Sequence, residues 1–380
     1  MKKKTVWIPV AMFLALIYGG MLWGFMKPDR QYSDTENRFL TARPEFSLKA
    51  LFDGSFTKDY EKYITDQFPV RDEWIGLKTG VEALLGKTET KGVWLAREGY
   101  LIVNYPASDF ETKRAQDNIR FLAEAVKDYS ERLGQEHVRV MLVPSASQIL
   151  TDLLPAFCPR YDQSGYLKAV EEAVGPESCI DMEEVLAAHK EEYIYYRTDH
   201  HWTTLGAFYA YEAWAESMGF TPVADSCLKV VSQDFLGTTW SRLHGMGRAD
   251  EISVYDTDME VTRIRNLTER EEGFYNWEAL KTRDQYAVFL GGNDGIVELE
   301  PGDKESGQDP ERVLLVVKDS FANCLIPYAA GHYDRVVVAD LRYLNMSLKA
   351  VAEKYGVTDL LVLYHAQAFA TEATVFKIAR

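Results

Sequence analysis

The chain has 380 residues and a formal net charge of −16, from 42 basic and 58 acidic side chains. Residues 1–30 hold five basic groups and one acidic group, so the rest of the chain carries −20. This acidity argues against a nucleic-acid partner, because phosphate contacts require clusters of Lys and Arg. The length is sufficient for a large hydrophobic core in one elaborated domain.

Residues 1–30 predict an N-terminal membrane anchor. Lys2, Lys3 and Lys4 precede an uncharged run at residues 5–26. As a helix this run extends about 33 Å, enough to cross a bilayer core of roughly 30 Å. The basic flank predicts a cytoplasmic N-terminus and an extracytoplasmic remainder, so the protein is expected at the cell membrane. A cleaved signal peptide is the alternative, but the run exceeds the usual apolar region of about 7–15 residues and no A-x-A-like site follows.

Residues 31–90 predict a helical stalk or packing region between the anchor and the main domain. Apolar residues recur there at helical spacing, and Gly54 and Pro69 interrupt the pattern. The helices are expected at residues 47–53, 56–68 and 71–85.

Residues 91–380 alternate between strand and helix patterns, which predicts an α/β domain with a parallel sheet covered by helices on both faces. A hairpin is expected at 93–103. Further strands are expected at 137–143, 179–181, 312–318, 335–338 and 359–364. Helices are expected at 109–133, 166–174, 183–190, 204–218, 321–330 and 345–355. Residues 228–311 are rich in turns and short strands and are interpreted as a β-rich insertion. In such folds, active sites lie at the carboxyl ends of the strands.

The four cysteines contain no C-x-x-C pair, which argues against a zinc knuckle or a redox motif. Disulfides are permissible outside the membrane, and Cys158 and Cys179 are the closest pair in sequence. Free, mostly buried thiols are the preferred interpretation.

Reactive side chains first gather at Asp199-His200-His201-Trp202. In extended backbone, residues i and i+2 point to the same side, so Asp199 and His201 are expected to face one site while His200 faces elsewhere. An aspartate beside an imidazole is the orienter–base pair of hydrolytic triads. Two alternatives remain: histidines packed near a helix start, and a metal-binding triplet, which would require further Asp or His ligands.

The second candidate is Lys318-Asp319-Ser320, which follows an apolar strand and precedes a predicted helix. Ser320 would then lie at a helix N-terminus, where free N–H groups and the helix dipole stabilise an oxyanion. The alternative is that Ser320 only caps the helix. Asp319 is an equally good cap, which would leave Ser320 available as a nucleophile.

These motifs resemble the DHHW family. Residues Tyr195 to Thr203, Y-Y-R-T-D-H-H-W-T, are similar to its signature, and the family resembles the SGNH-hydrolase-like domains of the alginate O-acetyltransferases, whose motif is D-x-H-W. Other matching segments follow in family order: Glu36-Asn37-Arg38, Asp66-Gln67-Phe68-Pro69-Val70-Arg71-Asp72, Gly291-Gly292-Asn293, Lys318-Asp319-Ser320 and Asp340-Leu341-Arg342-Tyr343. The resemblance covers most of residues 33–380.

The resemblance implies an SGNH-hydrolase-like fold and a triad in which the D-x-H pair precedes the serine. Asp199 would orient, His201 would act as general base and then acid, and Ser320 would be the nucleophile. Because His200 replaces a small residue of the acetyltransferases, a swap of roles between His200 and His201 stays open. No G-D-S motif surrounds Ser320.

Other positions match less closely. Arg342 is expected to contact the acyl group or the sugar, and the Gly292 N–H and the Asn293 side chain are candidate oxyanion donors. Tyr196 and His200 are further substrate-site candidates within the signature.

The resemblance implies O-acetylation of a cell-wall or exopolysaccharide glycan, without a cofactor or metal and with a membrane-bound O-acyltransferase as acyl donor. A carbohydrate esterase with the same triad and a non-catalytic glycan-binding protein of the cell surface are the alternatives.

Overall fold

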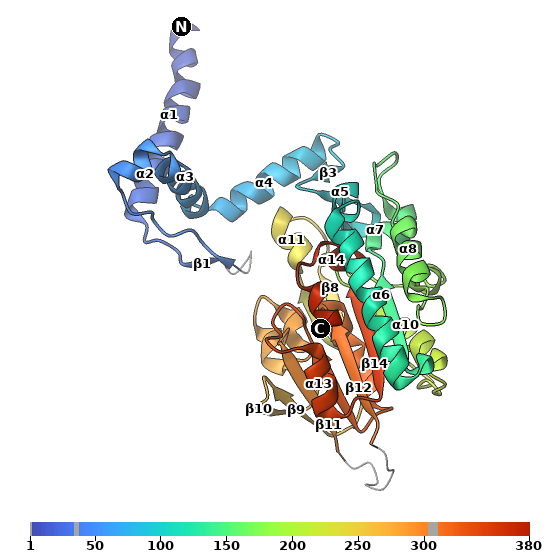
Figure 1. Cartoon of the computed structure of the whole chain (residues 1–380). Helices are drawn as coiled ribbons and strands as arrows, with labels where there is room; N and C mark the ends of the chain where they lie inside the picture. The colour runs from blue at the N-terminus through green and yellow to red at the C-terminus, as the bar shows by residue number, and fades with distance from the viewer. Residues whose placement is uncertain (1, 34–37, 303–310) are drawn as a thin grey trace. The chain divides into compact units, whose positions relative to one another are not determined.

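The computed structural model describes residues 2–33, 38–302 and 311–380, and the chain forms two compact units (Figure 1). Residues 1–87 and 241–246 make up the N-terminal unit, and residues 88–240 and 247–380 make up the main unit. Glu36 and Asn37 of the first family motif lie outside the described residues.

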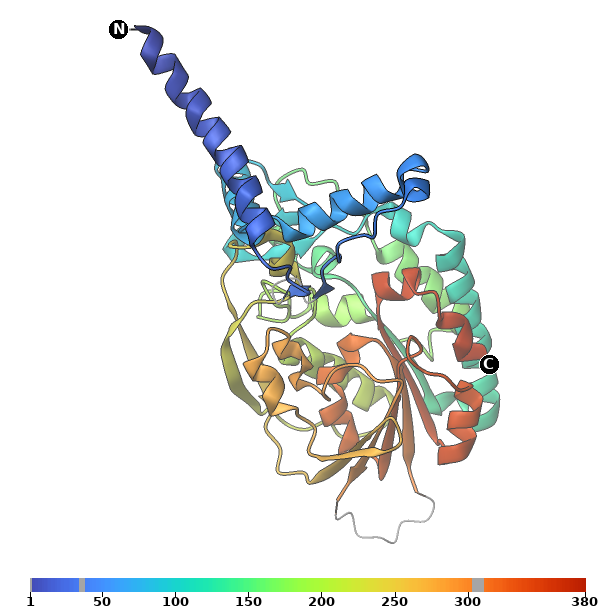
Figure 2. The same ribbon diagram turned by 90° about the vertical axis from the view of Figure 1, so that its left-hand side faces the viewer.

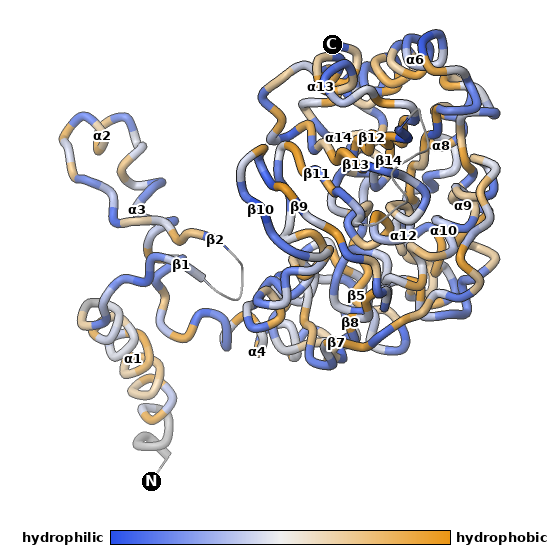
Figure 3. Tube along the Cα trace, turned by 90° about the horizontal axis from the view of Figure 1, so that it is seen from below, coloured by the Kyte–Doolittle hydropathy of each residue, from blue (hydrophilic) through white to orange (hydrophobic). Residues whose placement is uncertain are grey.

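The N-terminal unit begins with a long apolar helix, α1 (Lys2–Met26). Its segment Trp7–Gly24 has a mean hydropathy of 1.6, and none of that window is buried. By length and composition α1 can cross a membrane, and Figure 3 shows its hydrophobic colouring. This agrees with the apolar run found in the sequence.

Three shorter helices follow as the spacing predicted: α2 (Leu48–Phe52), α3 (Ser55–Gln67) and α4 (Arg71–Leu84). Ser47 caps α2 by accepting a hydrogen bond from Ala50 N at 3.1 Å. Two short strands, β1 (Tyr32–Ser33) and β2 (Arg38–Phe39), pair in antiparallel fashion ahead of these helices.

Two N-terminal segments that the sequence suggested as family motifs make structural contacts. Asp66 accepts two hydrogen bonds from the Arg38 guanidinium, at 2.6 and 3.0 Å, and two from Thr41. The hydrogen bonds from Arg38 hold the pKa of Asp66 well below its usual range. Gln67 exchanges hydrogen bonds with the backbone of Arg30 at 2.8 and 2.9 Å. These residues therefore tie the segment after α1 to the end of α3.

The main unit is built on a seven-stranded sheet of order β10-β9-β11-β13-β12-β14-β6. Its strands are β6 (Val138–Val143), β9 (Val261–Arg265), β10 (Glu269–Glu272), β11 (Ile296–Pro301), β12 (Val313–Lys318), β13 (Arg335–Ala339) and β14 (Asp359–His365).

The expected parallel sheet is found only in part, because the sheet is mixed. Strands β13, β12, β14 and β6 are parallel, whereas β11, β9 and β10 pair in antiparallel fashion at one edge. These antiparallel strands come from residues 228–311, and short connections such as the one between β9 and β10 permit only antiparallel pairing. Residues 228–311, which the sequence indicated as an insertion, thus extend the main sheet.

Alternating residues of the strands face two hydrophobic layers. In β12, Leu314 and Val316 belong to one core cluster, and Val313, Leu315 and Val317 belong to the other. This alternation follows from the period of two along a strand. Figure 2 shows the sheet with helices on either side of it, and Figure 3 shows hydrophobic colouring along its strands.

Helices cover both faces of the sheet. One face carries α6 (Lys113–Leu133), α8 (Ser164–Val174), α13 (Leu348–Tyr355) and α14 (Ala366–Thr371). The other carries α9 (Met182–Ala187), α10 (Thr204–Ser217) and α12 (Ile326–Ala330). The shorter helices are α5 (Ala107–Phe110), α7 (Ala146–Ile149) and α11 (Thr238–Leu243). One small sheet consists of β3 (Glu89–Thr90), β4 (Val93–Leu95) and β5 (Leu101–Val103), and another of β7 (Leu228–Phe235) and β8 (Asp250–Tyr255).

Local expectations differ from the structure at a few places. The helix predicted at 109–133 is two helices, because Thr112 caps a new one by accepting from Ala115 N. Residue Cys179 makes only an isolated bridge to Val140 instead of a strand. All four cysteines are free, but only Cys324 is fully buried.

Candidate active site

The signature segment forms a tight loop ahead of α10. Tyr195 and Trp202 pair across an isolated antiparallel bridge, and Tyr196 N donates to His201 O at 3.2 Å. The loop between them bends at residues 197–201 instead of running extended. The expectation that His200 faces elsewhere is therefore wrong, since the centroid of its ring lies 3.9 Å from that of the His201 ring. Thr203 then caps α10 by accepting from Gly206 N.

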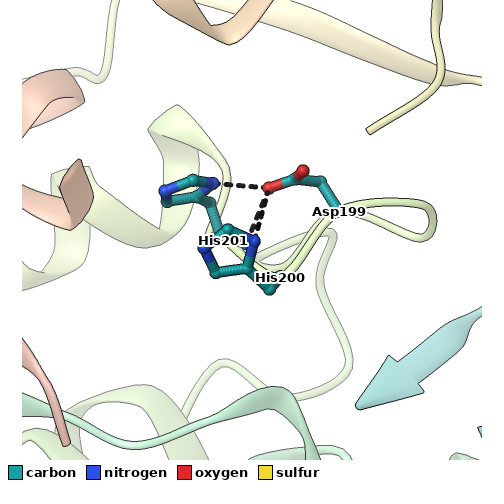
Figure 4. Close-up of side chains that lie close together, drawn as sticks. All are labelled: Asp199, His200 and His201. Atoms are coloured by element: carbon teal, nitrogen blue, oxygen red, sulfur yellow. Dashed lines mark hydrogen bonds and ion pairs between the residues drawn. The ribbon is translucent and has the colours of Figure 1, made fainter. Parts of the chain in front are cut away.

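Three side chains form a continuous hydrogen-bonded chain. His201 Nδ1 lies 2.5 Å from Asp199 Oδ1, and His201 Nε2 lies 2.7 Å from Ser320 Oγ. Asp199 and His201 are buried, whereas Ser320 is partly accessible. Figure 4 shows one oxygen of the Asp199 carboxylate facing the imidazoles of both His200 and His201. The structure therefore brings together the aspartate, the histidine and the serine that the sequence singled out.

The charge on Asp199 sets the direction of these hydrogen bonds. Its second oxygen, Oδ2, accepts from Thr238 N at 2.7 Å and from Thr238 Oγ1 at 2.9 Å. Burial raises the pKa of Asp199, but His200, His201 and these hydrogen bonds outweigh burial and hold that pKa well below its usual range. An ionised carboxylate only accepts, so His201 Nδ1–H donates to it. In the neutral imidazole, Nε2 is then the acceptor that faces the Ser320 hydroxyl.

The neighbouring His200 has different partners. Its Nδ1 lies 2.8 Å from Thr238 Oγ1 and 3.5 Å from Asp199 Oδ1. Asp199, His200 and His201 also form a cluster of possible metal ligands, with all three ligand atoms within 4.8 Å. However, two ligands at about 2.1 Å from a tetrahedral zinc ion lie roughly 3.4 Å apart. The 2.5 Å separation of Asp199 Oδ1 and His201 Nδ1 is that of a hydrogen bond.

Ser320 follows β12 in a turn held by Asp319. The Asp319 carboxylate accepts from Phe321 N and from His365 N, both at 2.9 Å, and so ties the serine turn to the end of β14. Burial raises the pKa of Asp319. Asp319 is therefore the cap, which leaves the Ser320 hydroxyl facing His201.

The helix predicted after Ser320 is found only in part. Residues Ser320–Cys324 form a 3₁₀ helix, and α12 begins only at Ile326. Pro327 lacks a backbone N–H and fits only the first turn of a helix, so it starts α12 rather than extending an earlier one. A long helix dipole therefore does not act at Ser320.

Aromatic side chains line the imidazole. The Tyr286 ring stacks on His201, with centroids 3.9 Å apart and planes at 11°, and its hydroxyl donates to Ser320 O at 3.2 Å. Trp202 Nε1–H donates to Phe321 O at 2.8 Å. Tyr286 was missed by sequence reasoning, because it lies in the segment interpreted as an insertion and no local pattern marks it.

Asp250 at the start of β8 was missed for the same reason. Its carboxylate is fully buried and accepts from Arg197 N and Thr198 N, both at 2.8 Å, and from Thr198 Oγ1 at 2.5 Å. The Tyr193 hydroxyl also donates to it. Asp250 therefore fixes the backbone immediately before Asp199.

The Gly292 N–H, expected as an oxyanion donor, instead donates to Phe289 O at 3.2 Å. Leu290, Gly291 and Gly292 all have positive φ, at 59°, 80° and 103°, and this run closes a turn that occupies the N–H. Asn293, which follows, is partly buried, and its Oδ1 accepts from Lys318 Nζ at 2.7 Å.

Two other predicted site residues have side-chain partners outside the three-residue chain. Arg342 forms two side-chain hydrogen bonds to Asp340, at 2.6 and 2.9 Å, and its charged group lies over the Tyr343 ring. Tyr196 is fully buried and packs edge-on against Phe235 and Tyr286. The assignment of Tyr196 to substrate contact is therefore wrong, since an enclosed ring supports Tyr286 instead.

Comparisons with known proteins agree with the sequence motifs. Residues 166–339 match the sequence model of the DHHW protein family, a range that contains Asp199, His201 and Ser320. The expected resemblance to this family is confirmed. No curated protein matches the chain.

Similar solved structures include a DHHW family protein from Eubacterium siraeum, with 23% identity and a TM-score of 0.61 over 76% of this chain and 95% of that one. Bacillus cereus PatB1 with a sulfonyl adduct has 18% identity and a TM-score of 0.58 over 76% of this chain and 100% of its own. The O-acetyltransferase domain of Pseudomonas putida AlgJ has 15% identity and a TM-score of 0.41, over 74% and 93%. The first two likenesses show a shared fold.

Proposed function

Since residues 166–339 carry the DHHW family segment, we propose that the protein is a membrane-anchored, extracytoplasmic serine acyl-transfer enzyme. Its substrate is a cell-wall or exopolysaccharide glycan, which it O-acetylates. The observation that carries the proposal is the continuous chain from Asp199 Oδ1 through His201 to Ser320 Oγ, at 2.5 and 2.7 Å. The 2.7 Å distance between His201 Nε2 and Ser320 Oγ lies within the range of about 2.6–3.2 Å required of a nucleophile and its general base.

The reaction proceeds in two halves. Ser320 Oγ attacks the acyl carbonyl carbon while His201 Nε2 takes the hydroxyl proton, and Asp199 stabilises the resulting imidazolium. The tetrahedral intermediate collapses, the donor's leaving oxygen takes the proton from His201, and an acyl ester remains on Ser320. An acceptor hydroxyl then attacks that ester with His201 again as base, which releases the product and restores Ser320.

Several features support a sugar hydroxyl as the acceptor. The basic flank of α1 predicts that the main unit lies outside the cytoplasm, where envelope glycans are found. The resemblance to the DHHW family implies an acyl donor supplied by a membrane-bound O-acyltransferase. The Tyr286 ring stacks on His201 at a centroid distance of 3.9 Å, and the Phe321 ring lies at a tilt with its centroid 5.0 Å away. These aromatic walls limit access of water to the base.

A covalent probe tests the nucleophile directly. Sulfonyl fluorides react with activated serine hydroxyls, and the similar PatB1 structure contains a sulfonyl adduct. The full chain is purified in detergent, treated with phenylmethylsulfonyl fluoride and digested for mass spectrometry. We expect a single modified peptide that contains Ser320, with no label in Ser320→Ala. The control is Ser108→Ala, an exposed serine of α5, which keeps the label.

Hydrolysis of 4-nitrophenyl acetate and transfer to glycan fragments give the activity. Ser320→Ala should lower both rates by roughly 10³-fold or more, because the remaining groups supply no nucleophile. Unchanged hydrolysis in Ser320→Ala would refute the triad. If acetyl is released to water but never appears on peptidoglycan or exopolysaccharide fragments, the enzyme is an esterase and the acceptor part of the proposal is wrong.

The anchor is tested separately. A reporter enzyme that is active only outside the cytoplasm, fused after Arg380, should be active in intact cells. A reporter that is active only when cytoplasmic would contradict the proposed orientation of α1.

A further inference from the structure

Lys318, the last residue of β12, is a fully buried lysine two positions before Ser320. Its Nζ donates to Asn293 Oδ1 and to Asn323 Oδ1, both at 2.7 Å, and lies 3.9 Å from Asp340 Oδ2. An ammonium group is costly to bury unless it is paired and hydrogen-bonded. A core position in a parallel strand would ordinarily hold an aliphatic residue, so this lysine requires an explanation beyond packing.

The chemistry of the ammonium group determines how both amides are turned. Lysine only donates hydrogen bonds, so Asn293 and Asn323 must each present the carbonyl oxygen to it and the NH₂ group to the opposite side. The NH₂ group of Asn323 donates to Gly292 O at 3.3 Å. Among the residues that the structure describes, the NH₂ group of Asn293 has no such acceptor, and the side chain is partly accessible.

We propose that Lys318 is a positioning residue that holds the Asn293 amide with its NH₂ group toward the acyl oxygen, as a donor of the oxyanion site. This inference rests on the proposed function and names a role that the triad does not supply. Lys318 and Asn323 flank Ser320 in the chain, and both contact Asn293. The amide is thereby tied to the segment that carries the nucleophile.

The direction of the amide decides its effect on the reaction. An amide oxygen turned toward the developing oxyanion would repel it, whereas an amide NH₂ group stabilises it. The turn of Leu290, Gly291 and Gly292 with positive φ does not by itself fix the side chain of the residue that follows. A donor-only group at Lys318 Nζ excludes the flipped amide.

The charge on Lys318 is balanced nearby. Asp340 is fully buried and also binds Arg342. Burial lowers the pKa of Lys318 to about 8, and Asp340 opposes that decrease. Lysine therefore keeps its proton, and its donor-only character, at neutral pH.

Substitutions at both ends of the contact test the inference. Lys318→Met keeps the length of the side chain and removes the donor, and Asn293→Ala removes the amide. Each variant of the full chain should lower kcat for acetyl ester hydrolysis by roughly 10²–10³-fold, with KM changed by less than about threefold. Because the two residues act as one unit, the kcat of the double variant should equal that of the slower single variant.

Two conservative variants separate positioning from folding. Asn293→Asp keeps an oxygen for Lys318 but has no NH₂ group, so it should lose the same factor in kcat without a decrease in Tm. Lys318→Arg keeps a donor-only cation and should recover part of the kcat lost in Lys318→Met. Asn323→Ala, which removes an amide whose NH₂ group is already used, should lower kcat by a smaller factor than Asn293→Ala.

The inference is overturned if Lys318→Met lowers only Tm and leaves kcat unchanged, or if the losses of the two single variants multiply in the double variant. It is also overturned if Asn293→Asp retains wild-type kcat. These outcomes are distinct from failure of the proposed function, in which Ser320→Ala would retain activity.

Discussion

Gly237 offers a direct test of the geometry around Asp199. A Cβ atom at this position would lie 2.2 Å from Asp199 Cβ and 2.4 Å from Asp199 Oδ2. Carbon atoms pack favourably at about 3.5–4.0 Å, so in Gly237→Ala one of the two segments must move by at least roughly 1.3 Å. The backbone of Gly237 does not require glycine, since its φ is not positive, and the whole effect comes from this contact.

Such a displacement would break the carboxylate's hydrogen bonds. Asp199 Oδ2 would lose its 2.7 Å contact with Thr238 N, and Oδ1 would lose its 2.5 Å contact with His201 Nδ1. A misplacement of about 1 Å can cost 10²-fold in rate, so kcat for acetyl ester hydrolysis should fall by about 10²-fold or more. The rate of labelling by phenylmethylsulfonyl fluoride should fall in parallel, because His201 would no longer be held as a base.

Gly165→Ala is the matched control. Gly165 lies in α8, and an added Cβ there meets no heavy atom within 4 Å. We expect unchanged kcat and an unchanged or slightly raised Tm, since alanine favours a helix. If Gly237→Ala kept kcat and the labelling rate within twofold of the wild type, the proposed dependence on Asp199 geometry would be refuted.

Three further predictions follow from the contacts around the site. Thr238→Val removes the 2.9 Å hydroxyl bond to Asp199 but keeps the backbone N–H, so kcat should fall by about 10-fold in the ester assay. Asp250→Asn turns an NH₂ group toward the Thr198 N–H or hydroxyl and should destabilise the fold by about 3 kcal/mol in urea unfolding; an unchanged midpoint would contradict it. The pKa of Lys318 is about 8 in the folded protein, against an ordinary value of 10.5. The free-energy cost of burying its charge is therefore fully present below pH 8 and disappears as the pH rises to 10.5. The unfolding free energy of the wild type relative to Lys318→Met should therefore rise by about 3 kcal/mol across that interval, and a flat difference would refute it.

The sequence alone determined the features that depend on neighbouring residues. The apolar run of α1, the helices at 48–84 and the buried strands β6, β12 and β14 follow from hydrophobic spacing, which is local information. The pairing of Asp199 with His201 was expected from their i, i+2 spacing, although the loop that carries them bends instead of running extended. The resemblance to the DHHW family added the order in which the D-x-H pair precedes the serine.

The tertiary structure alone decided which distant groups meet. His201 and Ser320 are 119 residues apart, and the 2.7 Å contact between them selects His201 over His200 as the serine's neighbour. Thr238 and Tyr286 reach the site from a segment that the sequence indicated only as an insertion. Periodicity reports which face of an element is buried, but not what packs against that face.

The same reason explains the corrections. The antiparallel edge of the sheet, the occupied Gly292 N–H and the enclosed Tyr196 ring all depend on pairings between segments. The resemblance could nominate residues by position, but whether an N–H is free or a ring is exposed is decided only when the chain has folded. Lys318 is the clearest case: its sequence position marks the end of a strand, and its two amide contacts show why a charge lies there.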